Sequence, residues 1–293
     1  MANAAPASIG RVNASGSEDA LFLKVFAGEV ITSFNRASVT EGSEMVRSIA
    51  SGKSATFPVM GRIDAEYHTP GAEINGQDVN HNEKVITIND LLISHAFLSN
   101  LEEAKNHWDV RSAYSTEIGR ALAFTKDRHV LQTIGLASQA NANVTGGDGG
   151  TTITNTDIAN ATAATSANGF ITALFDAAKA LDNNYVPSEG RVCFLDPEMY
   201  YKLANATNAI NVDFSGKGSI AEGKVQKIAG ITLKPCPHFV KSDVGTSSVF
   251  AGSATQGGST PQSVNLTNYE GLVCHPSAVG TVKLMDLATE MEY

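Results

Sequence analysis

The sequence is poor in cysteine, in basic residues and in long apolar runs, and each shortage excludes a class of protein. Three cysteines in 293 residues, Cys193, Cys236 and Cys274, are an odd number without a CxxC pair, so no disulfide framework is expected. We expect each thiol to be a small buried side chain. No stretch approaches the roughly 18 apolar residues that a membrane-spanning helix requires. Residues 1–18 lack the apolar centre of a secretory signal, so we expect a chain that begins in a cytosol.

The shortage of positive charge argues against direct recognition of nucleic acid. The chain has 21 Lys and Arg against 30 Asp and Glu, a formal net charge of -9, and its basic residues are scattered. A protein that grips a phosphate backbone is expected to show a basic face. An acidic wall that does not adhere to DNA remains compatible with this composition.

Catalytic and cofactor motifs are also missing. Gly52-Lys53-Ser54 resembles part of a phosphate loop, but Arg47 stands where such a loop needs glycine, and strand-like sequence follows instead of a helix. The seven histidines are dispersed without metal-ligand spacing. Cys274-His275 could pair a nucleophile with a base, yet neighbours in a strand point to opposite faces. We therefore expect no catalytic residue, no metal site and no cofactor.

The N-terminal region predicts a loose arm followed by one amphipathic helix. Residues 15–18 have the form of a capping box. Behind them Phe22, Phe26, Val30 and Phe34 recur at helical spacing until about Arg36. A helix beside a loose terminus suggests docking onto a neighbouring copy, with Phe22 and Phe26 as candidate contacts.

Residues 54–89 predict a long β-hairpin. Ile63, Ala65 and Tyr67 alternate with charged neighbours, and 85–88 return as a β-branched strand. The middle, residues 68–82, is polar and offers little for a core. Because such a hairpin is marginal alone, we expect it to project and lie on another subunit. The candidate contacts in this hairpin are Arg62, Asp64, Glu66, Tyr67 and Glu73.

The remainder predicts one long helix and a compact α/β region. Residues 101–138 show helical texture, with one apolar stripe through Val110, Tyr114, Ile118, Ala121, Leu122 and Thr125 and a second through Phe124, Leu131 and Ile134. The glycine-rich stretch 141–168 reads as a surface loop or boundary. After it we expect a helix near 170–181, a buried strand at 191–195, a helix from Asp196-Pro197, and strands at 228–234, 271–275 and 280–284.

Collinear blocks of this sequence closely resemble the major capsid protein of the short-tailed, T-seven-like bacteriophages. No single block is specific, but together they run in order from about Leu21 to Leu287. The blocks are 21–26, 45–49, 51–55, 83–88, 109–112, 184–187 and 277–284.

The resemblance implies the Hong Kong 97 capsid fold, an α+β fold whose parts appear in the order read above. It implies an N-terminal arm and helix at 1–50, an extended β-hairpin loop at 51–90 and a peripheral domain with a long spine helix at 91–145. An axial α/β domain at 146–268 and return strands at 269–293 would complete the subunit.

The resemblance also implies a structural role and not an enzymatic one. Copies would form the hexamers and pentamers of an icosahedral shell, assembled around a scaffolding protein in the bacterial cytoplasm, with a portal protein at one vertex. The shell of the virion would enclose double-stranded DNA without sequence-specific binding and without a membrane. An encapsulin-like compartment of the same fold, which holds cargo protein, remains the alternative, and an α/β enzyme built on 168–250 lacks an assembled site.

Overall fold

The computed structural model describes residues 30, 32–34, 37–71, 73–74, 76, 78–88, 91–96, 110–206, 218–219, 224–225, 227–239, 241–243 and 264–289. The chain divides into two compact units, and each is described by itself. The first comprises Met1–Ser38, Leu91–Asp127 and Met285–Tyr293, and the second comprises Val39–Asp90 and Arg128–Leu284. No helix among the described residues is long and apolar enough to cross a membrane.

A four-stranded mixed sheet forms the centre of the second unit. Its order is β7 (Lys227–Ile228), β8 (Ile231–Pro235), β4 (Val192–Leu195) and β9 (Gly271–Cys274). Strand β4 runs parallel to β8 and antiparallel to β9. All four residues of β4 are buried, as expected for a central strand covered on both faces.

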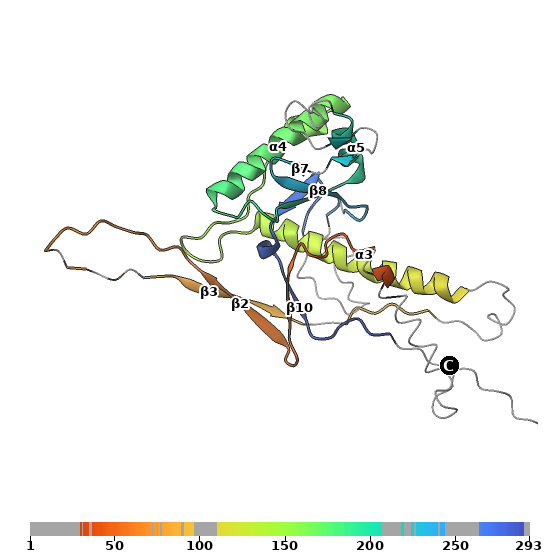
Figure 1. Cartoon of the computed structure of the whole chain (residues 1–293), viewed down its shortest axis with the longest axis horizontal. Helices are drawn as coiled ribbons and strands as arrows, with labels where there is room; N and C mark the ends of the chain where they lie inside the picture. The colour runs from red at the N-terminus through yellow and green to blue at the C-terminus, as the bar shows by residue number, and fades with distance from the viewer. Residues whose placement is uncertain are drawn as a thin grey trace, which may run out of the picture. The chain divides into compact units, whose positions relative to one another are not determined.

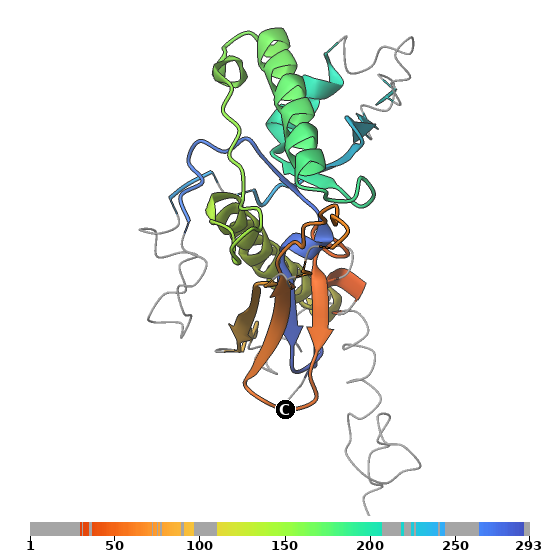
Figure 2. The ribbon, with the colours of Figure 1, turned by 90° about the vertical axis from the view of Figure 1, so that its left-hand side faces the viewer.

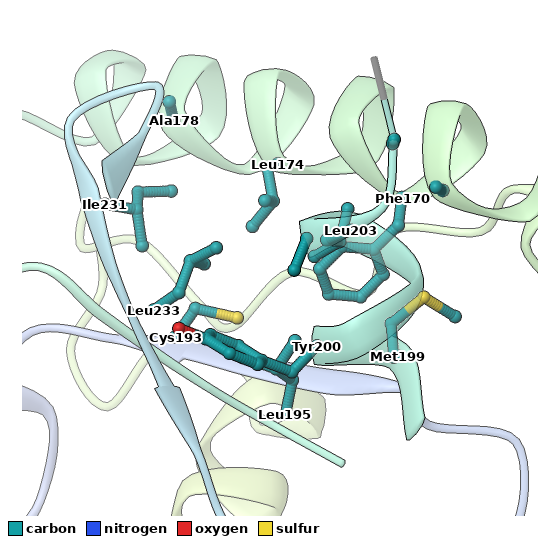
Figure 3. Close-up of a cluster of buried hydrophobic side chains, with 13 residues drawn as sticks. Phe170, Leu174, Ala178, Cys193, Leu195, Met199, Tyr200, Leu203, Ile231 and Leu233 are labelled. Carbon is teal, nitrogen blue, oxygen red and sulfur yellow. The ribbon is translucent and has the colours of Figure 1, made fainter. Parts of the chain in front are cut away.

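One face of this sheet packs against helices α4 (Ala163–Asn183) and α5 (Pro197–Ala204). Figure 3 shows Phe170 and Leu174 of α4 and Leu203 of α5 pointing toward side chains of the strands. The predicted helix near 170–181 is confirmed, and so is the helix start at Asp196, which is the N-cap residue ahead of Pro197. The buried cluster contains Ala167, Phe170, Leu174, Ala178, Cys193, Leu195, Met199, Tyr200, Leu203, Ala204, Ala206, Ile231 and Leu233.

The other face packs against the C-terminal part of α3 (Val110–Gln139). Since side chains alternate along a strand, Val192 and Phe194 point to this side while Cys193 and Leu195 point to the other. The predicted long helix is confirmed from Val110 onward, and residues 101–109 lie outside the described part. The cluster contains Val130, Leu131, Ile134, Val192, Phe194, Cys236, Leu272, Cys274 and Val279.

The first predicted stripe of α3 is wrong in part. Tyr114 and Ala121 are exposed, whereas Ser115 and Gly119 are buried. A Cβ at Gly119 would lie 2.7 Å from the carbonyl oxygen of Val30, so the backbone of residue 30 approaches α3 closely there. The buried positions on this face are small residues, so they do not appear in the sequence as a stripe of large apolar side chains.

Two further strand pairs belong to the second unit. Strand β1 (Met45–Ser48) runs parallel to β10 (Gly280–Lys283), and β2 (Ser54–Met60) runs antiparallel to β3 (His81–Thr87). Figure 1 shows β2 and β3 side by side, continuing into a long loop, and Figure 2 shows β10 in blue beside orange strands. The strands predicted at 271–275 and 280–284 are confirmed.

Two strand predictions need correction, and one strand was missed. Residues 62–67, expected to continue the strand, are irregular because pairing ends at Met60 and His81. The strand predicted at 228–234 is a hairpin, β7–β8, turned at Ala229 and Gly230, which both have positive φ. Strand β1 was not predicted, because its partner β10 lies near the other end of the chain.

The remaining short elements complete the description. The 3-10 helix η2 (Thr156–Ala159) precedes α4, and η4 (Pro276–Ala278) separates β9 from β10. Strands β5 (Gly218–Ser219) and β6 (Lys224–Val225) form a two-residue pair.

Candidate subunit-contact site at the extended loop

The hairpin β2–β3 has one face against its own subunit and one face open. Ala55 is buried and Phe57 and Val59 are half-buried, while the alternate residues Thr56, Pro58 and Met60 are exposed. A Cβ at Gly280 of β10 would lie 3.1 Å from the Phe57 ring. The base of the hairpin therefore packs on β10, and glycine at that position permits the close approach.

Beyond β2 the chain forms what we call the extended loop, residues 61–80, and it is exposed. Every described residue from 62 to 78 is exposed, including Ile63 at 65%, Tyr67 at 105% and Ile74 at 79%. Among the described residues from 63 to 79 none makes a hydrogen bond or ion pair with the rest of the subunit. The predicted contacts Asp64, Glu66, Tyr67 and Glu73 lie on this open stretch.

After Arg62 all the Asp, Glu, Lys and Arg residues of the extended loop are acidic. Between 63 and 80 it carries Asp64, Glu66, Glu73 and Asp78 but no lysine or arginine. An acidic surface of this kind favours a partner surface that is basic or supplies hydrogen-bond donors.

Arg62, the remaining predicted contact in the loop, is engaged within its own subunit. Its guanidinium forms an ion pair with Asp148 and donates to the carbonyl oxygen of Asn184 at 3.2 Å. It also lies over the ring of Tyr185, 4.9 Å from the centroid. We call Arg62, Asp148, Asn184 and Tyr185 the loop root.

Asp148 is held in place by a tightly folded glycine-rich loop. The amide of Gly147 donates to the carbonyl of Val144 at 3.0 Å, and that of Gly150 to the carbonyl of Ala140 at 2.8 Å. A Cβ at Gly150 would lie 2.0 Å from the carbonyl oxygen of Ala137, so only glycine fits against the end of α3. The sequence predicted a surface loop or a boundary here, and the structure shows a loop held by its own backbone hydrogen bonds.

Tyr185 is held by the C-terminal cap of α4. The amide of Val186 bonds the carbonyl of Leu181 at 3.0 Å and the amide of Tyr185 bonds that of Asp182 at 3.0 Å, which is a Schellman motif. Tyr185 occupies its left-handed position with φ 55°, where glycine is usual. Buried Arg191 supports the cap by donating to Asp182 and to the carbonyl of Val186, each at 2.6 Å.

The C-terminal end of the extended loop, where the chain enters β3, is also held by hydrogen bonds. The side-chain amide of Asn82 donates to the carbonyl oxygen of Asn143, and the amide of Gly61 to the carbonyl of Asn80 at 2.8 Å. Sequence reasoning missed Asn82, Asp148 and Tyr185, because their roles depend on contacts between segments far apart in the chain.

The other sequence motifs form no chemical site in the part of the chain that the structure describes. Ser54, after Gly52-Lys53, begins strand β2 and not a helix. Burial raises the pKa of the Cys274 thiol to about 12, so this cysteine is not a thiolate beside His275. No group of three or more metal-ligating side chains was found among the described residues. Phe22 and Phe26 lie outside those residues. All three cysteines are buried and free, as predicted.

One cavity in the described part of the chain does not change this conclusion. It measures about 760 Å³ and lies between α3, α4 and β9, with Ile134, Phe170 and Leu174 among its lining residues. Its carboxylate, Glu270, is neutralised by Lys241 at 2.6 Å. The lining therefore presents no pair of groups arranged for acid–base chemistry.

Comparisons with known proteins agree on one family. A family model described as "Gp10A-like: Major capsid protein" matches residues 56–293. The major capsid protein of Escherichia phage T7 is 39% identical, over 95% of this chain and 85% of that protein. The major capsid protein of Enterobacteria phage T3 is 36% identical, over 96% and 85%. A chain from the capsid structure of cyanophage P-SCSP1u superposes with a TM-score of 0.72 at 42% identity, over 97% of this chain and 87% of that one.

Proposed function

The chain belongs to the Gp10A-like family of major capsid proteins, and we propose that its copies build the icosahedral shell of a bacteriophage. Its α+β fold is a phage capsid fold. The observation that carries the proposal is the similarity to phage major capsid proteins along almost the whole chain. The family is a structural one, which agrees with the absence of a catalytic constellation in the sequence.

The exposure of the extended loop supports the proposal that copies of the chain assemble through contacts with one another. Ile63, Tyr67 and Ile74 are large apolar side chains that the subunit leaves in water. A loop of this length without its own core gains burial from a neighbour. We infer that Asp64, Glu66 and Glu73 pair with groups on the adjacent subunit, while Tyr67 supplies apolar contact.

The finer assignments follow from the family and remain part of this proposal. Residues 1–50 would act as the N-terminal arm, with Phe22 and Phe26 docking on a neighbour, and α3 would be the spine helix of the peripheral domain. Residues 146–268 would form the axial domain, around which hexamers and pentamers close. The net charge of -9 supports a wall along which packaged double-stranded DNA moves without adhering.

The proposal includes partners that act during assembly. A scaffolding protein would guide the subunits in the bacterial cytoplasm, and a portal protein would occupy one vertex of the virion shell. For this chain the proposal includes no cofactor and no membrane.

Electron microscopy of the expressed protein tests this function. We expect closed particles of uniform size when the subunit is produced with its scaffolding protein, and irregular closed or tubular assemblies without it. Particles from infected cells should contain nuclease-protected DNA. A stable monomer at high concentration under both conditions contradicts shell formation, and particles filled with a cargo protein favour the compartment alternative.

A further inference from the structure

We propose that Arg62 is a positioning residue, and that the loop root fixes the direction in which the extended loop leaves its subunit. Its effect on shell geometry rests on the proposed function, whereas its effect on the loop belongs to the isolated subunit. The proposal assigns Arg62 to its own subunit and leaves Asp64, Glu66, Tyr67 and Glu73 for the neighbour.

The position of Arg62 in the chain suits this role. It is the second residue after β2 ends, so it stands where the paired ribbon becomes an irregular loop. Its three partners belong to two separate segments, the glycine-rich loop at Asp148 and the cap of α4 at Asn184 and Tyr185. An ion pair, a hydrogen bond and a ring contact made to separate segments restrain the orientation of the side chain as well as its distance.

The platform that receives Arg62 is rigid. Arg191, only 3% exposed, donates to Asp182, to the carbonyl of Val186 and to that of Pro187 at 2.9 Å. These hydrogen bonds fix the backbone on both sides of Tyr185.

The conformation of Tyr185 provides an independent argument. A non-glycine residue at φ 55° is strained, and the Tyr185 side chain is 82% exposed, so the strain gains no core burial. Glycine would satisfy the Schellman motif without this strain. What tyrosine adds at this position is the ring beneath the Arg62 guanidinium, 4.9 Å away.

A small rotation at the loop root would displace the tip of the extended loop by a large distance, and this affects the geometry of a shell. From Arg62 to the turn at Gly71 the chain reaches at most about 30 Å at roughly 3.3 Å per residue. A swing of about 10° at the root therefore moves the tip by about 5 Å, the width of one residue step or more. Copies that join head to tail close into a shell only when the rotation between neighbours is fixed. A free root should therefore produce particles of mixed curvature.

The direct test measures the loop in the unassembled subunit. Spin labels on Glu73→Cys and Glu189→Cys report the distance between the loop and the α4–β4 connection, and the three native cysteines are buried. We expect a narrow distance distribution in the otherwise unchanged chain, and one at least twofold broader after Arg62→Ala or Tyr185→Gly. Equal widths in all variants would overturn the proposal.

The controls separate positioning from folding. Arg120→Ala removes another exposed arginine that pairs with a carboxylate, Glu117 at 2.9 Å, and lies over a ring, Phe124 at 5.8 Å, so its distribution should stay narrow. Tyr185→Gly removes backbone strain, so its melting temperature should be unchanged or higher although its loop is released. A Tyr185→Gly subunit that melts earlier and keeps a narrow distribution shows that the ring serves stability instead.

The second test uses particles. With scaffolding protein, Arg120→Ala should give the same single diameter as the unchanged chain, whereas Arg62→Ala and Tyr185→Gly should give a broadened distribution with open or tubular forms. Unchanged diameters would refute the link between root and curvature. If the unchanged chain forms no shells, the proposed function fails, while the distance measurements still decide the role of Arg62.

Discussion

Replacing the extended loop with a tight turn should abolish shells and leave the subunit folded. Met60 and His81 form the last pair of the β2–β3 ribbon, so a two-residue Asn-Gly turn between them replaces residues 61–80 without changing the register. The loss includes the half-exposed ion pair of Arg62, about 0–1 kcal/mol, and its ring contact, about 0.5–1 kcal/mol.

Shortening the loop also brings a gain of similar size. Closing a loop of about two residues instead of about 20 saves roughly 2 kcal/mol of chain entropy, from (3/2)RT ln 10. The two effects largely offset each other, so the free energy of unfolding should change by about 1.5 kcal/mol or less. For a subunit of this size the melting temperature should then shift by no more than about 3–6 °C.

Thermal melting followed by circular dichroism, and electron microscopy with scaffolding protein, measure the two outcomes separately. Arg62→Ala in the full-length chain is the control, since it loses the same root contacts but keeps the loop, and it should still assemble, although into particles of mixed curvature. Normal shells from the shortened chain would refute the reasoning, because the loop would then contribute nothing to assembly. A shortened chain that does not fold would show that the loop belongs to the core.

Three further predictions concern the shell and the core. Because residues 61–80 contain no lysine to form an isopeptide bond, boiled mature particles should give a single monomer band on a denaturing gel, and a ladder would contradict this. Burial raises the pKa of the Cys193 thiol and raises that of Cys274 to about 12, above the ordinary value of 9.0. Because the buried thiols resist ionisation in the folded state, the stability that they contribute is complete below about pH 9. It is lost as the pH rises above that value, by roughly 1.4 kcal/mol per thiol per pH unit. The denaturant midpoint should therefore be lower at pH 10 than at pH 8, and equal midpoints would contradict this. Phe194→Ala removes a fully buried ring and should cost about 3–5 kcal/mol in chemical denaturation, while Phe175→Ala, at a phenylalanine that is 57% exposed, should cost much less.

The elements that sequence predicts well are those whose signal is local. Strand β4 is a short run of apolar residues, and α5 begins at a proline, so both can be read without knowing their partners. Helix α4 shows large apolar residues at helical spacing. In each case the residues of one segment are enough to predict the element, without knowledge of the segments that it packs against.

The features that sequence missed depend on distant partners. Strand β1 exists because it pairs with β10, and the buried face of α3 at Ser115 and Gly119 consists of small residues that another segment covers. Alternation at residues 62–67 indicated a strand, but pairing stops at Met60 because the opposite side of the loop continues without strand structure. Periodicity describes which face a strand would bury, and it does not supply the partner.

The same limit applies to the candidate site. Sequence identified the extended loop and its exposed charges, but it assigned Arg62 to a neighbour because Asp148 and Tyr185 are far away in the chain. The structure brings those residues to Arg62 within one subunit. That Asp64, Glu66, Tyr67 and Glu73 bind a neighbouring copy stays a prediction.

The exposed side chains of the loop also suggest why shells, and not dimers, would be the stable product. Burying Ile63, Tyr67 and Ile74 on a neighbour would contribute roughly 1.5–3 kcal/mol each. Association of two subunits costs an estimated 4–15 kcal/mol in lost freedom, together with the ordering of the loop. One such contact is therefore weak, and a misplaced subunit can dissociate. In the proposed closed ring a subunit would give its loop to one neighbour and receive a loop from another, so it would gain two contacts while its freedom is lost once. Assembly should therefore begin sharply at a threshold concentration, with few dimers below it.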